Sequence, residues 1–176
     1  MSDATLTAPR DYKANPEPLR LGTHLLCRNG EGKFLTVFKA NLETPRWGLP
    51  GGSRGGMPGE TPNETVTRHM FTRLGIVLPT PTLVLHCDWV GERQYPAGLN
   101  LFFDGGVLSD RKAAQVRLMP NSGYSDVQWF TGEELLSRRA DDNGRARLEA
   151  ALAALETGQG SLMTILGEGG KSLLAE

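Results

Sequence analysis

A short stretch of the chain gathers side chains that suit phosphate chemistry. His69, Thr72 and Arg73 are spaced so that, at about 100° per residue, they share one arc of a helix. A guanidinium group matches the oxygens of a phosphate, and an imidazole can act as a general base near neutral pH. This arc therefore predicts either a phosphate-binding face, with His69 catalytic and Arg73 binding ligand, or an ordinary solvated helix surface.

The segment that must position this arc carries strong helix signals. Thr61 suits an N-cap, Pro62 suits the first helical position, and Glu64 completes a capping box. Apolar residues recur every four positions: Val66, Met70 and Leu74. Gly75 is placed to end the helix. We therefore predict a helix over 61–74 that packs through this stripe, with Glu64 favoured as a cap over a ligand-binding residue.

A glycine-rich loop precedes the predicted helix. It begins at Leu49-Pro50-Gly51-Gly52 and continues through further glycines to Gly59. Arg46 and Trp47 stand just before it, and both are candidate ligand-binding residues. The indole of Trp47 suits either stacking on a base or, as the favoured alternative, packing in the core.

Short strands dominate the rest of the chain. Alternating or β-branched segments predict strands at 21–28, 34–39, 83–90, 99–107 and 126–130. Helical spacing predicts a short helix from 132 and a terminal helix over 145–155. This order indicates an α+β domain, in which helices flank a mixed β-sheet as an α/β/α sandwich. We expect a flexible arm at 1–18, the domain at 19–157 and a tail at 158–176.

Taken in order, these motifs resemble the Nudix hydrolase superfamily. The box of that family reads G-x5-E-x7-R-E-U-x-E-E-x-G-U, where U is apolar, and Leu-Pro-Gly-Gly commonly precedes it. The matching segments are Leu49-Pro50-Gly51-Gly52, Gly59-Glu60-Thr61-Pro62, Arg68 and Leu74-Gly75-Ile76. The resemblance covers roughly residues 20–137 and implies the Nudix fold. It also implies that Glu60 and Arg68 pair, tying the loop to the helix, and it makes both of them catalytic candidates beside His69.

The chain departs from the family pattern where the family binds metal. The loop between Gly52 and Glu60 is two residues longer, and all three box glutamates after Arg68 are replaced, by His69, Thr72 and Arg73. Magnesium prefers oxygen ligands, and arginine cannot ligate a cation. We therefore expect no metal on this helix. A Mg²⁺ cofactor would need acidic residues elsewhere, and the candidates are Asp88, Glu92, Asp104 and Asp126.

The resemblance leaves three functions open. The first is hydrolysis of a nucleoside diphosphate-linked or other diphosphate compound by an atypical site that lacks the metal-binding glutamates. The second is a catalytically inactive Nudix-fold protein that binds a ligand or serves as an accessory factor. The third is a different reaction on a phosphorylated intermediate of specialised metabolism.

Composition and charge limit the classes of partner that we expect the chain to bind. The chain has 176 residues, a formal net charge of −1 and two cysteines, which fits one domain with no whole-surface attraction to nucleic acid or anionic lipid. It shows no signal-peptide pattern, and no apolar run approaches the roughly 20 residues of a membrane helix. We expect a cytoplasmic protein with a small-molecule diphosphate ligand and with neither a nucleic-acid nor a membrane partner. A homodimer is left open.

Overall fold

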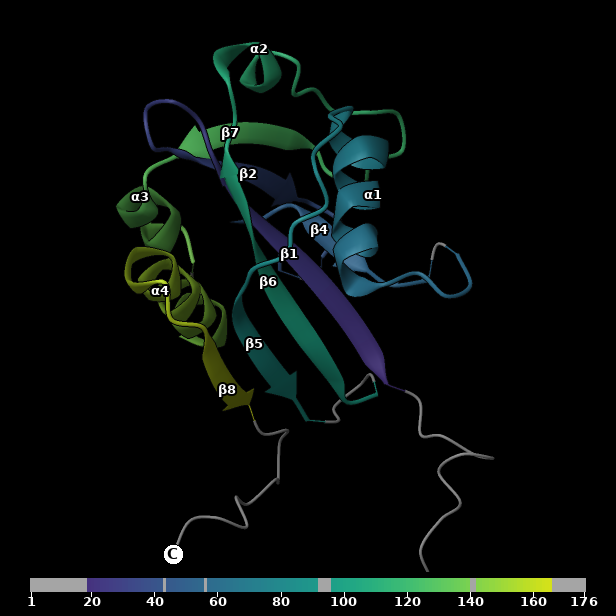
Figure 1. Ribbon diagram of the computed structural model, residues 1–176, viewed down its shortest axis with the longest axis vertical. Helices are drawn as coiled ribbons and strands as arrows, with labels where there is room; N and C mark the ends of the chain where they lie inside the picture. The colour runs from purple at the N-terminus through teal and green to yellow at the C-terminus, as the bar shows by residue number, and fades with distance from the viewer. Residues whose placement is uncertain (1–18, 43, 56, 92–95, 140–141, 166–176) are drawn as a thin grey trace, which may run out of the picture.

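A mixed β-sheet with helices on both faces forms the body of the protein (Figure 1). The computed structural model describes residues 19–42, 44–55, 57–91, 96–139 and 142–165. In chain order the elements are β1 (Arg20–Arg28), β2 (Phe34–Lys39), β3 (Arg46–Gly48), β4 (Gly51–Ser53), α1 (Pro62–Leu74), β5 (Val84–Val90), β6 (Gly98–Val107), α2 (Asp110–Ala113), β7 (Asp126–Phe130), α3 (Gly132–Ser137), α4 (Asp142–Thr157) and β8 (Ser161–Ile165).

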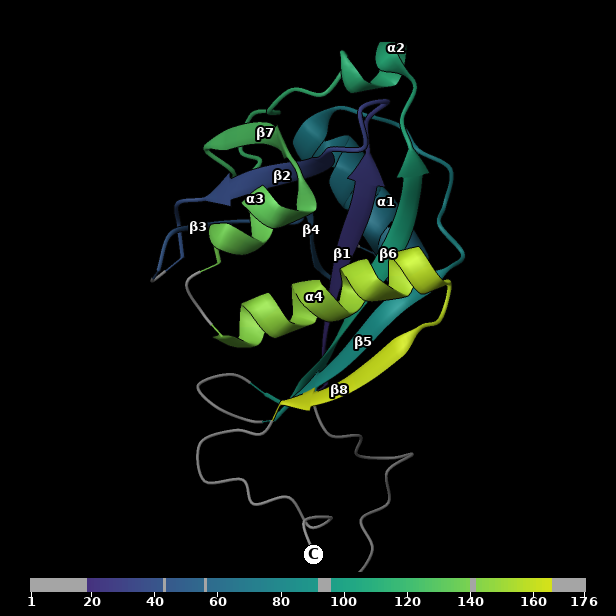
Figure 2. The same ribbon diagram turned by 90° about the vertical axis from the view of Figure 1, so that its left-hand side faces the viewer.

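The sheet joins parallel and antiparallel strands. Its order is β3-β2-β1-β6-β5-β8, while β4 pairs with β1 and β7 pairs with β2. Strand β1 is antiparallel to β2 and parallel to β6, and β5 is antiparallel to β6 and parallel to β8. Helix α1 covers one face, and α3 and α4 cover the other (Figures 1 and 2). The predicted fold class is therefore confirmed.

Side chains that alternate between the two faces of the sheet form two separate apolar cores. Leu25 of β1 packs with the α1 stripe, whereas its neighbour Leu26 packs on the other face with Leu148 of α4. Successive side chains of a strand point to opposite faces, so β1 contributes to both cores. This arrangement gives the sheet two separately covered faces. One carries α1 and its loop, and the other carries α4.

Helix α1 follows its sequence signals closely. The Thr61 side chain accepts from the Glu64 backbone N–H, and Glu64 in turn accepts from the Thr61 N–H at 2.8 Å. The three stripe residues are fully buried: Val66, Met70 and Leu74. Gly75 adopts a left-handed φ of 69°, a conformation that glycine reaches without a Cβ penalty. The predicted helix, cap and core contact are all confirmed.

The C-terminal part of the described chain differs from expectation. Residues 161–165, expected within a tail, form β8 and pair in parallel with β5. Without β8, β5 would be an edge strand with unpaired backbone N–H and C=O groups. Pairing with β5 therefore stabilises a strand that the short segment does not encode by itself. The short helix α2 was also not expected. The predicted arm at 1–18 lies outside the described residues. In the described part of the chain, no helix is long and apolar enough to cross a membrane.

Candidate functional site

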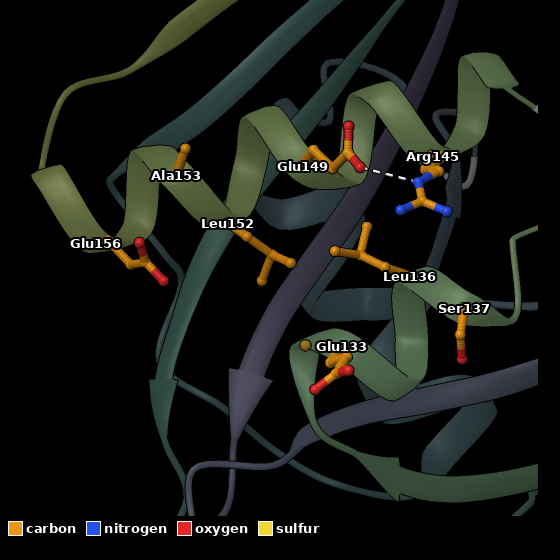
Figure 3. A pocket seen from close by; sticks show the side chains of 9 residues that line it. Glu133, Leu136, Ser137, Arg145, Glu149, Leu152, Ala153 and Glu156 are labelled. Atoms are coloured by element: carbon orange, nitrogen blue, oxygen red, sulfur yellow. Dashed lines mark hydrogen bonds and ion pairs between the residues drawn. The ribbon is translucent and has the colours of Figure 1, made fainter.

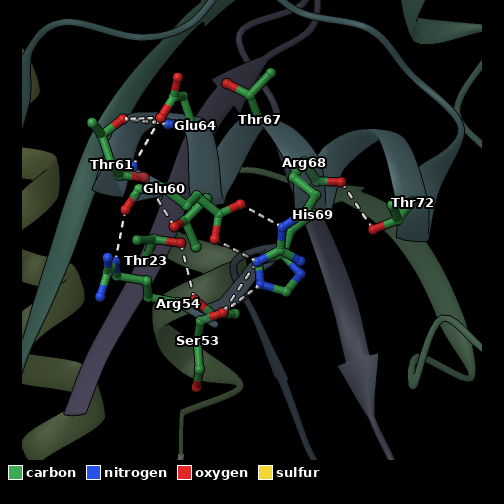
Figure 4. A network of polar contacts seen from close by, with 12 residues as sticks. Thr23, Ser53, Arg54, Glu60, Thr61, Glu64, Thr67, Arg68, His69 and Thr72 are labelled. Atoms are coloured by element: carbon green, nitrogen blue, oxygen red, sulfur yellow. Dashed lines mark hydrogen bonds and ion pairs between the residues drawn. The ribbon is translucent and has the colours of Figure 1, made fainter. Parts of the chain in front are cut away.

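The carboxylate of Glu60 and the guanidinium of Arg68 form a two-point ion pair (Figure 4). Arg68 donates through Nε to Oε1 at 2.5 Å and through Nη2 to Oε2 at 3.1 Å. The Glu60 side chain is 4% exposed and that of Arg68 is 26% exposed. Arg54 also donates to the backbone oxygen of Glu60, at 2.7 Å. The expected pairing is confirmed, and it ties the glycine-rich loop to α1.

Both ring nitrogens of His69 are engaged. Nε2 lies 3.0 Å from the carbonyl oxygen of Ser53, and Nδ1 accepts a hydrogen bond from Arg73 Nε at 3.0 Å. This pattern is that of a neutral ring that donates through Nε2. Burial lowers the pKa of His69, and the charges of Arg73 and Arg68 lower it further against the hydrogen bond to Ser53. His69 therefore connects helix and loop, with neither nitrogen available to a reacting group.

Arg73 completes a closed ring of contacts around the start of the loop. Its guanidinium carbon lies 5.1 Å from the centre of the Tyr124 ring. The Tyr124 hydroxyl donates to Gly51 O at 2.6 Å and accepts from Gly51 N at 3.1 Å. The chain of contacts runs from Ser53 through His69, Arg73 and Tyr124 to Gly51, so this arc of α1 holds the loop in shape. The sequence analysis did not identify Tyr124, because this residue lies far from the loop and α1 along the chain and shares no spacing pattern with them.

Magnesium does not fit this arc. His69 and Arg73 bind each other, and Thr72 Oγ1 donates to the Arg68 carbonyl at 2.9 Å. In the described part of the chain, no three His, Cys, Asp or Glu side chains are grouped so as to hold a metal.

The acidic residues considered as alternative ligands also have protein partners. Asp88 is fully buried and contacts Arg147, Asp104 accepts from Gly106 N, and Asp126 accepts from Val127 N. The fourth candidate, Glu92, lies outside the described residues. None of these three belongs to a group of three or more His, Cys, Asp or Glu side chains in the part of the chain that the structure describes.

A cationic cleft lies on the other face of the sheet, beneath α4. Its volume is about 520 Å³, and strands β1, β2, β3 and β6 contribute to its lining together with α4. Five cationic side chains line it: Arg20, Lys39, Arg46, Arg139 and Arg147. Ser53 also reaches the lining, so the glycine-rich loop contributes to it. Such a surface suits a polyanionic ligand.

Burial and neighbouring positive charges lower the pKa values of two residues in the cleft. Burial lowers the pKa of Lys39 to about 8, and the charges of Arg139, Arg46 and Arg73 add to this shift. His24, on β1, stacks on Phe102 with ring centres 4.7 Å apart. Burial, followed by the charges of Lys39 and other cleft cations, lowers the pKa of His24 well below its ordinary value. His24 is therefore a neutral aromatic surface at neutral pH.

Protein partners hold two of the cleft arginines. Arg147 Nε lies 2.7 Å from Asp88 Oδ2, and Arg139 Nη1 donates to the Trp47 carbonyl at 3.1 Å. By contrast, among the described residues no carboxylate pairs with Arg20, Lys39 or Arg46. Arg20, Lys39 and Arg46 thus bring positive charge into the cleft without a paired carboxylate among the described residues.

The structure separates the predicted site residues into two places. Arg46 lines the cleft. Trp47 packs against Phe38 and Phe130, with ring centres 5.3 and 4.9 Å away, in agreement with its core alternative. The remaining candidates lie in the contacts of α1 and its loop: Glu60, Glu64, Arg68, His69 and Arg73. Sequence reasoning missed the other cleft cations and His24, because they are scattered along the chain and only the fold brings them together.

A second pocket, of about 550 Å³, lies between α3 and α4 (Figure 3). Its lining carries three carboxylates, Glu133, Glu149 and Glu156, and its Arg145 is paired with Glu149 at 2.9 Å. This acidic lining does not suit a phosphate ligand. The cationic cleft is therefore the candidate ligand site.

Comparison with known proteins identifies the fold. No protein-family model matches the sequence, and no curated protein matches it. Among solved structures, the MutT protein from Methanosarcina mazei Go1 is 24% identical, with a TM-score of 0.63 and coverage of 80% of this chain and 98% of that one. The NUDIX domain of Shewanella oneidensis NrtR, complexed with ADP ribose, is 21% identical, with a TM-score of 0.63 and coverage of 88% and 99%.

An ADP-ribose pyrophosphatase from Streptococcus suis 89-1591 gives a similar result. It is 17% identical, with a TM-score of 0.58 and coverage of 84% of this chain and 99% of that one. At these identities the similarity concerns the backbone arrangement. The chain has the Nudix fold over most of its described length, as its motifs predicted.

Proposed function

We propose that this protein is a hydrolase of a nucleoside diphosphate-linked or other diphosphate compound, which it holds in the cationic cleft. The observation that carries the proposal is that Lys39 and Arg46 lie opposite each other in the strand register and line the cleft together with Arg139. Guanidinium and ammonium groups bind phosphate oxygens through charge-assisted hydrogen bonds. In the proposal, these protein cations neutralise the negative charge of the phosphate groups in the cleft.

Similar folds support the ligand class. The Shewanella NUDIX domain is complexed with ADP ribose, and the Streptococcus protein is an ADP-ribose pyrophosphatase. Both names include ADP-ribose, a compound in which a diphosphate links two organic groups. A cleft of about 520 Å³ is within the usual range for a small-molecule ligand. We expect that such a compound places its diphosphate against the cations and its organic groups along the rest of the cleft.

The α1 network reaches the cleft through Ser53. Ser53 lines the cleft, and its carbonyl oxygen lies 3.0 Å from His69 Nε2 and 3.4 Å from Arg68 Nη2. Through this contact Glu60, Arg68 and His69 are positioning residues of the proposed site. Of the predicted ligand-binding residues, Arg46 keeps that role in the proposal, whereas Arg73, Trp47 and Glu64 lie outside the lining.

A second candidate function is binding of the same compound without cleavage. The closed contacts of His69 and Arg73 favour it, because they occupy the arc where the family pattern has glutamates. Neither nitrogen of His69 is left to activate water. This function shares the cleft and the ligand class with the hydrolase, and it differs only in the absence of product.

One experiment separates the two. The full chain is incubated with ADP-ribose, UDP-glucose and diadenosine diphosphate, in EDTA and in Mg²⁺ or Mn²⁺. Binding is measured by calorimetry and product by chromatography. Product formation supports the hydrolase, and binding in EDTA without product under any condition supports the second function. No binding and no product across the panel contradicts both for these ligands. The Arg46→Gln variant should bind weakly, whereas Arg111→Gln, on exposed α2, should bind normally.

A further inference from the structure

The side-chain amide of Asn100, on β6, is buried in the lining of the cleft. Asn100 is only 5% exposed, yet it contributes to the cleft surface. Its Nδ2 donates to Asp88 Oδ1 at 2.7 Å, whereas its Oδ1 accepts no hydrogen bond from any of the described residues. A buried carbonyl oxygen without a donor is costly in free energy. A ligand that brings an N–H or O–H donor to this oxygen therefore gains affinity.

The carboxylate of Asp88 fixes the orientation of this amide. Asp88 is fully buried, and its Oδ2 lies 2.7 Å from Arg147 Nε of α4 and 4.0 Å from His86 Nε2. A carboxylate accepts hydrogen bonds and donates none, so only the NH₂ end of the Asn100 amide fits against it. The carbonyl end is thereby turned away from Asp88. Asp88 is a positioning residue for the acceptor.

Gly22 of β1 leaves room for the carbonyl end of the amide. Gly22 and Asn100 are partners in the parallel register of β1 and β6. A Cβ built on Gly22 would overlap Asn100 Oδ1, so the oxygen occupies the space of the missing side chain. Arg20 and His24, two residues to either side on the same face of β1, both line the cleft. The acceptor thus lies over β1, between two residues of the lining.

A flat, uncharged ring adjoins this acceptor. His24 is the register partner of Phe102 and stacks on it with ring centres 4.7 Å apart. Burial, followed by the charges of Lys39 and other cleft cations, lowers the pKa of His24, so the ring is neutral at neutral pH. Phe102 follows Asn100 by two residues, which span about 6.6 Å along a strand. A planar ring that lies against His24 therefore extends toward Asn100 Oδ1.

We infer that His24, Gly22 and Asn100 form a subsite for a nucleobase with an exocyclic amino group. The base lies against His24, and its amino group donates to Asn100 Oδ1, while the diphosphate contacts Lys39 and Arg46. A base that presents a carbonyl oxygen to Oδ1 would place acceptor against acceptor. This inference rests on the proposed function and narrows its ligand class to compounds of adenine, guanine or cytosine.

Nucleotide pairs that differ by one amino group test the subsite. Calorimetry on the full chain in EDTA compares ADP with purine riboside 5′-diphosphate, GDP with IDP, and CDP with pyrimidin-2-one riboside 5′-diphosphate. All of these compounds carry the same diphosphate. We expect the aminated member of at least one pair to bind about tenfold more tightly, since one hydrogen bond to a buried acceptor contributes roughly that factor.

Two substitutions act on the acceptor from different sides. Gly22→Ala places a methyl group where Asn100 Oδ1 lies and pushes the amide aside, so the two affinities of a pair should become nearly equal. Asp88→Asn offers the Asn100 amide both a donor and an acceptor, so it no longer fixes the orientation, and the preference should fall again. A merely structural role of either residue would lower both affinities or the melting temperature without changing the ratio within a pair.

Two controls make the outcome decisive. Gly132→Ala, on α3, introduces a methyl group that makes only ordinary van der Waals contacts outside the cleft, and it should leave the ratio unchanged. Lys39→Gln should weaken both members of the preferred pair equally.

The inference is overturned if the members of every pair bind with equal affinity, or if the preference persists in a folded Gly22→Ala protein. In either case binding of these nucleotides would still support the diphosphate ligand of the proposed function. If no member of any pair binds the unmodified chain, both the subsite and the proposed ligand fail for these probes.

Discussion

The arc of α1 and the cleft beneath α4 both contain arginines, but the interactions of the cationic side chains differ between the two places. On α1, Arg68 is paired with Glu60 at two points, and Arg73 is held between His69 and Tyr124. In the cleft, neither Lys39 nor Arg46 has a carboxylate partner among the described residues. Cations that the protein itself satisfies maintain shape. Cations held close together without a counter-charge are ready to bind an anion.

This difference carries an expected energetic cost. Like charges in a partly buried cleft repel, and this repulsion adds to burial, the largest cause of the lowered pKa of Lys39. Removing Lys39 or Arg46 should therefore weaken ligand binding without weakening the fold, whereas removing a partner on α1 should weaken the fold. The following predictions test this separation, from the largest effect to the smallest.

The double substitution of Lys39→Gln with Arg46→Gln should have the largest effect. Two charge-assisted contacts with phosphate are lost, so affinity for a diphosphate such as ADP should fall about 100- to 1,000-fold. The melting temperature should stay the same or rise, because two repelling charges are gone. Calorimetry with ADP and thermal unfolding measure both quantities. An unchanged affinity would contradict the assignment of the cleft, and the exposed Arg111→Gln variant serves as the control.

Ligand affinity should fall as pH rises above 8. In the free protein the pKa of Lys39 is about 8, because burial and the neighbouring Arg139, Arg46 and Arg73 disfavour its ammonium form. A bound diphosphate favours that form and raises the pKa, so the complex retains a proton that the free protein loses. Affinity should therefore decrease from pH 8 up to the pKa of the complex, by at most about tenfold per pH unit.

Calorimetry with ADP at pH 7, 8, 9 and 10 measures this decrease. Buffers with different ionisation enthalpies report the proton taken up on binding. The Lys39→Gln protein should show neither the decrease nor the uptake in this range. If that variant keeps the same pH profile as the unmodified chain, another group is responsible.

Arg68→Ala should destabilise the fold by about 1–3 kcal/mol, because it removes the two-point ion pair with the carboxylate of Glu60. The Glu60 side chain is 4% exposed, so water replaces the lost contact poorly. Denaturant unfolding measures the change in the free energy of unfolding. Lys33→Ala, which removes one partner of the exposed pair between Lys33 and Glu31, should have no clear effect. Equal stability of Arg68→Ala and the unmodified chain would show that the pair does not support the loop.

Tyr124→Phe should have the smallest effect, a loss of about 1 kcal/mol in the free energy of unfolding. It removes the hydroxyl that both donates to and accepts from Gly51, and it keeps the aromatic ring under Arg73. Ligand affinity should change much less than in Arg46→Gln, because Tyr124 does not line the cleft. A large loss of ADP binding with normal stability would place the ring of contacts on α1 within the ligand site.

Local patterns were sufficient to predict α1 and most strands. A capping box, a proline and a four-residue apolar repeat act within a few residues, so the bounds of α1 follow from the chain itself. The Glu60–Arg68 pair followed from the family resemblance, and its short span across one loop makes it insensitive to the rest of the fold. Strand β8 was not predicted, because its partner β5 lies about 75 residues earlier.

The sequence by itself determined the fold class, the loop and helix, and the presence of His69, Thr72 and Arg73 on that helix. It also placed these residues on one arc, since helix geometry depends only on spacing. Only the tertiary structure shows that this arc contacts the protein itself. Tyr124, which lies far along the chain, contacts Arg73 and donates a hydrogen bond to Gly51. The cleft was decided in the same way. Its cations come from β1, β2, β3, α4 and the connection between α3 and α4, and only the tertiary fold concentrates their charge in one place.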